Sequence, residues 1–207
     1  DKLGFPVFPL AYTNDETNEV SRGYKEDGYF ADGFINMLAF LGWNPGTEQE
    51  IFSLDELVQS FDLKRVSKSG AKFNPDKTKW FNQQYMQSKS DAELTDLFLP
   101  ILSEKGISKD KYFVQKVVSS IKERAVFVTD FWDLSSFFFE TPTEFDEKAA
   151  NKNWKPETAQ LMQELAQVIS NVEDFSSANT EKEIKEWITV KEIGFGKVMQ
   201  PLRLALV

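Results

Sequence analysis

The chain has 207 residues, 41% of them hydrophobic, which is enough for one large folded core or two to three small ones. It contains neither cysteine nor histidine. This excludes disulfide bonds, nearly every zinc, iron or copper site, and enzymes built on cysteine nucleophiles, Ser/His/Asp triads or histidine acid–base pairs. The net charge of −9 argues against a generally basic nucleic-acid binder. A nucleic-acid site in this chain would therefore be a local basic patch.

Neither a membrane span nor a secretory signal is visible in the sequence. No segment approaches the roughly 18 uninterrupted apolar residues that a membrane-spanning helix needs. The first residues, Asp1 to Leu10, lack a basic region followed by an apolar stretch. We therefore expect a cytoplasmic protein with no membrane partner.

The N-terminal part predicts a β-hairpin followed by two helices. Short apolar runs broken by prolines and a polar tract predict a strand, a turn and a returning strand between Leu3 and Tyr29. Apolar residues at helical spacing predict a helix over 29–41, with Gly42 as its stop. Ser53 and Glu56 form a capping box that opens the next helix.

One segment, from Phe61 to Ser90, is strongly basic. Its cationic side chains outnumber its two aspartates and are Lys64, Arg65, Lys68, Lys72, Lys77, Lys79 and Lys89. The part over 66–73 has no periodicity and predicts a loop, and Asn74 with Pro75 predicts the cap and first turn of a helix. This segment is the local patch that a nucleic-acid site would require.

The rest of the chain is predicted to be helical. The expected boundaries are a capping box at Ser90 and Glu93, a kink at Pro100, a stop at Gly106, a cap at Ser108 on a helix reaching Arg124, and an apolar segment from Phe127 to Phe139. A polar junction is expected over 141–156, before an amphipathic helix that starts at Pro156. Further on, the expected signals are a capping box at Thr180 and Glu183, a break at Gly194 and Gly196, and an apolar helix from Val198 to Val207. We expect that helix to be truncated at Val207, with a short natural C-terminus as the alternative.

Three stretches of this sequence resemble bacterial glutamyl-tRNA synthetases of class I, in the order in which that family carries them. They are Tyr24-Lys25-Glu26-Asp27-Gly28-Tyr29 with Asn36 to Trp43; Phe61-Asp62-Leu63 with Arg65-Val66-Ser67 and Phe73 to Tyr85; and Gly196 to Arg203. The chain departs from the family in a longer hairpin, Gly4 to Gly23, and in Thr78, where a leucine is usual. The resemblance covers most of the chain, because its landmarks run from Tyr24 to Arg203.

The resemblance implies a mainly α fold in three parts. These are an N-terminal β-hairpin with stem-contact helices (1–87), a first anticodon-binding helical bundle (88–150) and a second, C-terminally truncated one (151–207). The family's lysine signature would lie just before Asp1, so we expect the catalytic half to be missing. ATP and magnesium would serve only the full-length enzyme, and no catalytic, cofactor or metal residue is expected in this chain. The implied partners are glutamate tRNA and the missing N-terminal catalytic half, and we expect a monomer.

The resemblance also implies which residues bind tRNA. Lys64, Arg65, Lys68 and Lys72 would contact phosphates of the stem and position the RNA without reading its sequence. The alternative for these four cations is an ordinary solvated face.

Base recognition is assigned to residues further along the chain. Arg124 falls on the family arginine that faces the third anticodon base and separates glutamate from glutamine tRNA. Arg203, with Gln200 beside it in the same motif, falls on an anticodon contact of the second bundle. For Arg124 the alternative is a helix-end cation that is favoured by the helix dipole.

The aromatic residues are interpreted as core rather than as platforms for bases. Those at helical or buried-run spacing are Trp80, Phe81, Trp132, Phe137 to Phe139, Trp154 and Trp187. Without the resemblance, the same sequence would also fit a helical protein-interaction module that binds no nucleic acid. The basic segment favours the tRNA-binding hypothesis over that alternative.

Overall fold

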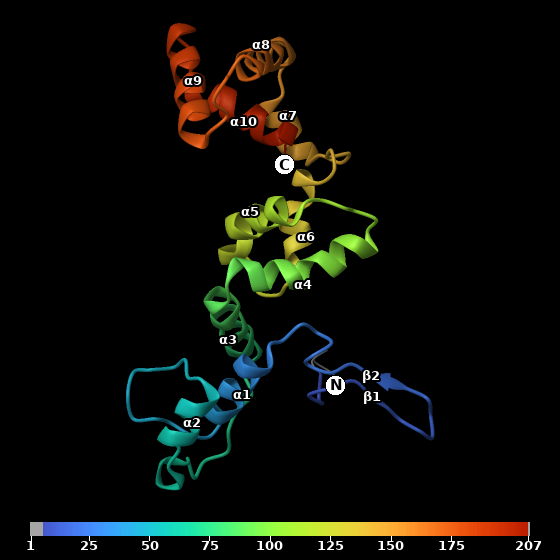
Figure 1. Ribbon diagram of the computed structural model, residues 1–207, viewed down its shortest axis with the longest axis vertical. Coiled ribbons are helices and arrows are strands. Elements are labelled where there is room, and N and C mark those ends of the chain that lie inside the picture. Colours follow the sequence, from blue (N-terminus) through green and yellow to red (C-terminus); the bar gives the residue numbers. More distant parts are fainter. Residues whose placement is uncertain (1–5, 207) are drawn as a thin grey trace. The chain divides into compact units, whose positions relative to one another are not determined.

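The computed structural model describes residues 6–206, and contacts divide the chain into two compact units, Asp1–Ser136 and Phe137–Val207. The described residues form ten α-helices, short 3-10 turns and one pair of antiparallel strands (Figure 1). This confirms the prediction of a mainly α fold that begins with a hairpin. The domain boundaries predicted after residues 87 and 150 stay predictions. Within residues 6–206 no helix is long and apolar enough to cross a membrane.

The hairpin pairs β1 (Tyr12–Thr13) with β2 (Val20–Ser21). Its turn is closed by Asn14, whose side-chain oxygen accepts hydrogen bonds from the amides of Glu16 and Thr17 at 2.9 and 3.3 Å. Such Asx turns are a common way to reverse the chain. The predicted start of the first strand, Leu3 to Phe5, lies outside the described residues.

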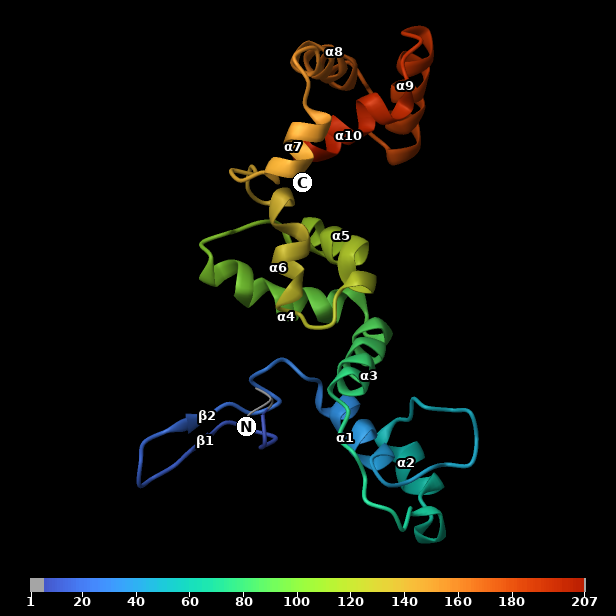
Figure 2. The ribbon, with the colours of Figure 1, turned by 180° about the vertical axis from the view of Figure 1, so that it is seen from behind.

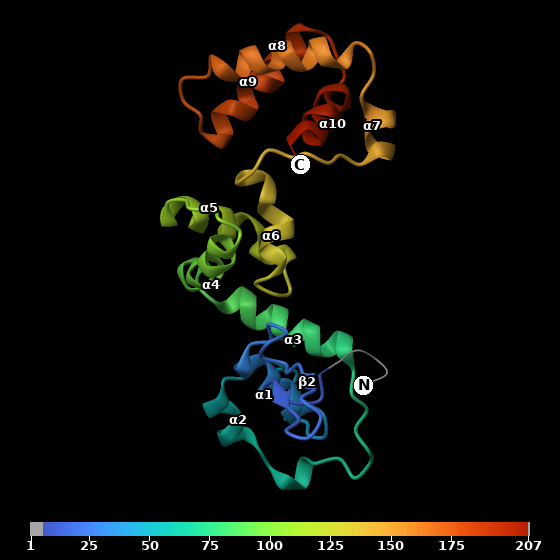
Figure 3. The ribbon, with the colours of Figure 1, turned by 90° about the vertical axis from the view of Figure 1, so that its right-hand side faces the viewer.

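Three α-helices complete the N-terminal part. They are α1 (Ala31–Phe40), α2 (Leu54–Ser60) and α3 (Pro75–Ser88), with a 3-10 turn at Leu63–Arg65. Figures 2 and 3 show α1 next to α3, and their shared core contains Met37, Phe81 and Tyr85. The predicted capping box at Ser53 and the predicted cap at Asn74 are both confirmed.

The next three helices pack on one another. They are α4 (Asp91–Glu104), α5 (Lys111–Ile121) and α6 (Asp130–Ser135), with 3-10 turns at Lys122–Arg124 and Ser136–Phe138. Phe98 and Phe131, both fully buried, meet edge to face with ring centroids 5.5 Å apart. The capping box at Ser90 is confirmed, and Gly106, at φ +75°, ends α4 as predicted. A positive φ at this position closes the helix end, and glycine adopts it without strain.

Two predictions about α5 are wrong. The cap is Asp110 rather than Ser108, because the Asp110 carboxylate accepts hydrogen bonds from the amides of Tyr112 and Phe113 at 3.0 and 3.2 Å. The α-helix also ends at Ile121, so Arg124 lies in a separate 3-10 turn and not in the body of α5.

The second unit consists of four helices. They are α7 (Glu147–Asn153), α8 (Thr158–Ser170), α9 (Ser177–Val190) and α10 (Phe195–Leu206). Their core contains Leu165 from α8, Ile184 and Ile188 from α9, and Val198 from α10. An ion pair between Lys191 and Glu164 links the end of α9 to α8.

Three predictions in this unit are corrected. Thr180 lies inside α9, because the helix begins earlier, where the Ser176 hydroxyl accepts a hydrogen bond from the Asn179 amide at 3.4 Å. Gly196 lies inside α10 instead of breaking the helix. The free energy gained by fully burying Val198 exceeds the modest cost of a glycine within a helix. The polar junction expected over 141–156 contains a short helix, α7, capped by the Asp146 carboxylate.

The predicted core aromatics divide into buried and exposed residues. Phe81 is fully buried, as its spacing predicted, whereas Phe138 and Trp154 are 43% and 40% exposed. The prediction is therefore wrong for the last two. Phe138 and Trp154 lie in short segments next to a polar stretch, where apolar spacing says little about burial.

Candidate nucleic-acid interface

The first candidate contact surface is the basic loop, defined here as residues 63–73. It carries Lys64, Arg65, Lys68 and Lys72, and all four side chains are exposed. The loop begins in the 3-10 turn Leu63–Arg65, and the Asp62 carboxylate accepts a hydrogen bond from the Lys64 amide at 2.9 Å. The structure thus presents these four predicted site residues on one surface segment of the first unit.

Backbone bonds tie the middle of the basic loop to the end of α1. The Ser67 amide donates to the Gly42 carbonyl at 2.7 Å, and Val66 bridges Trp43. The Arg65 guanidinium lies close against Gly46, which has φ +76°. A Cβ atom at position 46 would lie only 2.6 Å from this guanidinium. The first half of the loop therefore has a defined position, whereas Lys68 and Lys72 extend beyond these ties.

Charge compensation differs between the loop and the helix that follows it. In the part of the chain that the structure describes, none of the four loop cations forms an ion pair. By contrast, Lys77 on α3 pairs with Glu50 at 2.9 Å and lies 5.7 Å from the ring centre of Phe40. The loop cations keep their charge available to a polyanion, and phosphates bind to such uncompensated cations.

The second candidate surface is the Arg124 turn, defined as residues 122–126. Its Arg124 side chain is exposed, and the residues on either side of the 3-10 turn, Ile121 and Ala125, are fully buried. Within residues 6–206 the Arg124 guanidinium forms no ion pair. The backbone that carries this exposed guanidinium is anchored at both ends, and a guanidinium presents its donors in a planar fork that suits recognition of a base edge.

Lys122 ties the same turn to the start of α4. Its ammonium pairs with the Asp91 carboxylate at 2.8 Å and donates to the Lys89 carbonyl at 3.3 Å. The hydrogen bond from Lys122 lowers the pKa of Asp91 below its ordinary value, so the Asp91 carboxylate is charged at neutral pH. Both side chains are less than a third exposed, which reduces the screening of this pair by solvent.

The third candidate surface is on α10, in the second unit. Gln200 and Arg203 are both exposed and are three residues apart, which places them on one face of the helix. Pro201, between them, is buried, so this part of α10 is fixed against its own unit. The structure thus presents both predicted residues of the C-terminal motif to solvent together.

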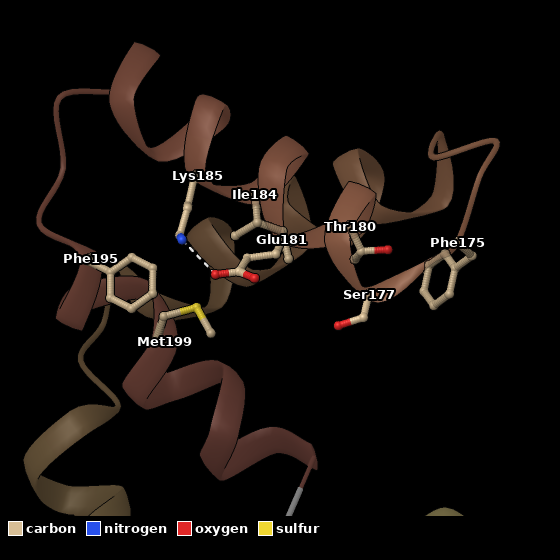
Figure 4. A pocket seen from close by; sticks show the side chains of 8 residues that line it. All are labelled: Phe175, Ser177, Thr180, Glu181, Ile184, Lys185, Phe195 and Met199. Carbon is tan, nitrogen blue, oxygen red and sulfur yellow. Dashed lines mark ion pairs between the residues drawn. The ribbon is translucent and has the colours of Figure 1, made fainter. Parts of the chain in front are cut away.

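A hollow of about 520 Å³ lies beside α10 and was not predicted from the sequence. Figure 4 shows it between the start of α9 and the first turns of α10, with Phe175 and Phe195 at its edges and the ion pair of Glu181 and Lys185 at its wall. The two phenylalanines are 68% and 51% exposed. Exposed rings of this kind can stack on unpaired bases.

The described residues offer little for metal binding. Residues 6–206 contain no cluster of three or more acidic side chains that could hold a metal ion.

Family models match most of the sequence. The model of an anticodon binding domain matches residues 93–207, which include the Arg124 turn and α10. The model of the catalytic domain of class I tRNA synthetases (E and Q) matches residues 15–80, which include the hairpin turn and the basic loop.

Whole-chain comparisons find similar proteins in several bacteria. The glutamate–tRNA ligases of Flavobacterium johnsoniae and Bacteroides fragilis are 58% and 49% identical over the whole chain, which spans 41% of each of these relatives. Among solved structures, a glutamate tRNA ligase from Elizabethkingia meningosepticum in complex with its amino acid superposes with a TM-score of 0.96 at 47% identity. That comparison covers all of this chain and 41% of the other.

Proposed function

Because this chain belongs to the anticodon-binding domain family, we propose that it is the tRNA-binding, C-terminal part of a bacterial glutamate–tRNA ligase. The observation that carries the proposal is the match over residues 93–207, together with three exposed cationic surfaces on the same chain. The full-length enzyme would ligate glutamate to its tRNA using ATP and magnesium. We further propose that it works as a monomer in the cytoplasm, with the catalytic half as its neighbour.

In this proposal the basic loop contacts the phosphates of the tRNA stem. Lys64, Arg65, Lys68 and Lys72 carry uncompensated charge, and each phosphate contact releases counterions from the RNA. Such contacts place the RNA without reading its sequence. The loop therefore supplies affinity and register rather than selectivity.

The Arg124 turn supplies selectivity for the third anticodon base. Its guanidinium carries fixed donors, which favour the acceptor-bearing edge of cytosine and disfavour the bulkier guanine of glutamine anticodons. The turn is held by buried neighbours on both sides, which keeps in place the backbone from which Arg124 extends. Gln200 and Arg203 on α10 would bind the anticodon from the second bundle.

Catalysis belongs to the proposed parent enzyme rather than to this chain. We expect the isolated chain not to catalyse glutamate-dependent exchange of pyrophosphate into ATP, because it has no glycine-rich phosphate loop and no lysine signature. Exchange by the pure chain above that of a buffer control would contradict this expectation.

The test of the proposed function is a filter-binding titration of the chain with unmodified glutamate tRNA at two salt concentrations. We expect binding that weakens with salt, because phosphate contacts release counterions, and that prefers glutamate tRNA over a variant with guanine at the third anticodon base. A chain that binds neither RNA at low salt would overturn the proposal. That result would favour a helical module that binds proteins instead.

A further inference from the structure

Asn82 on α3 forms hydrogen bonds with two segments that are far from it in the sequence. Its side chain is 1% exposed. The Oδ1 atom accepts a hydrogen bond from the Phe30 amide at 2.8 Å, and the Nδ2 atom donates to the Val126 carbonyl at 2.6 Å. Phe30 is the cap residue of α1, and Val126 is the last residue of the Arg124 turn. A single buried amide thus connects the start of α1 to the Arg124 turn.

The orientation of this amide follows from its partners. The Phe30 amide can only donate and the Val126 carbonyl can only accept, so Asn82 must present its oxygen to the first and its nitrogen to the second. In a flipped side chain, the Nδ2 donor would face the Phe30 amide and the Oδ1 acceptor would face the Val126 carbonyl, so neither hydrogen bond could form. Because the group is buried, losing either hydrogen bond would leave a polar atom without water.

Two further side chains of α3 hold the other end of the turn. Gln83 and Gln87 each place their Nε2 atom 3.4 Å from the Glu123 carbonyl. On the far side, the Asp130 carboxylate accepts hydrogen bonds from the Val126 and Phe127 amides, both at 2.9 Å. The backbone on both sides of Arg124 is therefore fixed by side chains rather than by helix or sheet bonds alone.

We infer that Asn82 is a positioning residue for Arg124, an inference that rests on the proposed function of this turn. Among the described residues no hydrogen bond or ion pair joins the Arg124 guanidinium to Asn82, so Asn82 acts through the backbone of the turn. A guanidinium distinguishes two bases only if its donors stay within about 0.5 Å of the correct place. Asn82 fixes that place by bonding the turn to α3.

The same helix begins at the basic loop. α3 has 14 residues, which corresponds to about 21 Å of helix. Asn74 caps the end next to the basic loop, and Asn82, Gln83 and Gln87, which hold the Arg124 turn, lie in the second half of the helix. α3 thereby sets the spacing between the phosphate contacts and the base reader within the first unit.

The test compares Asn82→Asp with Tyr85→Phe. Asn82→Asp keeps an oxygen for the Phe30 amide, and when ionised it places a second oxygen against the Val126 carbonyl, so it loses the bond to the turn while it keeps the bond to Phe30. Tyr85 is the matched control, because its buried hydroxyl bonds to Asn36 and Phe52 from the same helix but not to the turn.

The first measurement is the affinity ratio for glutamate tRNA over its variant with guanine at the third anticodon base. We expect Asn82→Asp to reduce the ratio roughly five- to tenfold, because a displaced recognition group loses contact quality steeply with distance. Tyr85→Phe should leave the ratio within about twofold, since it alters no contact of the turn. An Asn82→Asp ratio equal to that of the unchanged protein would overturn the inference.

The second measurement needs no RNA. Hydrogen exchange of the Val126 and Phe127 amides should become faster in Asn82→Asp and stay unchanged in Tyr85→Phe. If the unchanged protein does not distinguish the two tRNAs, the proposed function fails. The hydrogen-exchange rates then still decide whether Asn82 holds the turn. Faster exchange with an unchanged ratio would overturn the positioning role.

A second variant keeps the inference testable if Asn82→Asp does not fold. Replacing Gln83 and Gln87 together by alanine removes the two bonds to the Glu123 carbonyl from half-exposed positions, where alanine is a good helix former. We expect a smaller loss of ratio, roughly two- to fivefold, because the Asn82 and Asp130 bonds remain. An unchanged ratio in this folded variant would contradict the positioning of Arg124 by side-chain bonds from α3 to the turn, on which the role of Asn82 rests.

Discussion

The basic loop and the Arg124 turn both present exposed cations from 3-10 turns of the first unit, but they are built differently. In the loop, Leu63 is 78% exposed and the cations extend from backbone that is tied at its middle. In the turn, Ile121 and Ala125 are fully buried, and side chains of α3 and α6 bind the backbone. Charge alone suffices to attract phosphates, whereas distinguishing bases requires fixed geometry. The difference in construction thus matches the difference in proposed role.

The largest expected effect is on folding, because only one of the two regions rests on a core. Ile121→Ala should lower the free energy of unfolding by about 2–5 kcal/mol, since it opens a cavity beneath the Arg124 turn. Leu63→Ala in the basic loop should change it by less than about 0.5 kcal/mol, because that side chain is already in solvent. Urea denaturation of both variants measures the two values, and equal values would contradict the contrast.

The next effect concerns selectivity. Arg124→Gln should reduce the preference for glutamate tRNA over its guanine variant by roughly tenfold, since a good charge-assisted base contact is worth about 1–3 kcal/mol by analogy with DNA readout. Stability should change by only a few tenths of a kcal/mol, as expected for an exposed arginine near a helix end. The affinity ratio of the folded variant is the measurement. An unchanged ratio would leave Arg124 as a helix-end cation.

The basic loop should affect affinity without affecting selectivity. Replacing Lys68 and Lys72 by alanine should weaken binding equally for any tRNA and reduce the slope of log affinity against log salt by about 0.7–0.9 for each lost contact. Replacing Lys77, which is already paired with Glu50, by alanine is the control and should change the slope less. Affinities at three or more salt concentrations give the slopes. Unchanged binding would make the loop a solvated surface.

The smallest expected effect is the pH dependence of the ion pair between Asp91 and Lys122. The hydrogen bond from Lys122 lowers the pKa of Asp91 in the folded protein. The ion pair therefore contributes its full share to the free energy of unfolding above the ordinary aspartate pKa of about 3.9. It is lost as the pH falls through the lowered value. Asp91→Asn should therefore cost about 0.2–1 kcal/mol between pH 5 and 8 and progressively less below pH 4. A cost that does not diminish in acid would show that the ion pair is not its source.

Local patterns predicted several helix starts and missed others, for one physical reason. Ser53, Asn74 and Ser90 were identified correctly, because each has the full cap pattern next to the start of an apolar stripe. At Ser108 and Thr180 another cap-forming residue stands two to four positions earlier or later. The choice between such residues depends on which start buries the apolar stripe, and that is decided by packing rather than by local sequence.

The candidate site was predictable only where charge or resemblance marks it. The basic loop is visible as a run of lysines, and Arg124 and Arg203 follow from the resemblance. Asn82 is different, because its two partners lie 52 and 44 residues away and nothing in the sequence around it indicates them. Phe175 and Phe195 were also missed, since exposure of an isolated aromatic residue has no periodic signal.

The most direct test of this account combines both regions in one binding experiment. Affinities are measured at two salt concentrations for glutamate tRNA and its guanine variant. The proteins compared are the unchanged chain, Arg124→Gln, the pair Lys68→Ala with Lys72→Ala, and the triple variant. We predict that the salt slope changes only with the lysines, the affinity ratio changes only with Arg124, and the triple variant shows both changes together. A lysine pair that alters the ratio as much as Arg124→Gln would contradict the separation of affinity from recognition.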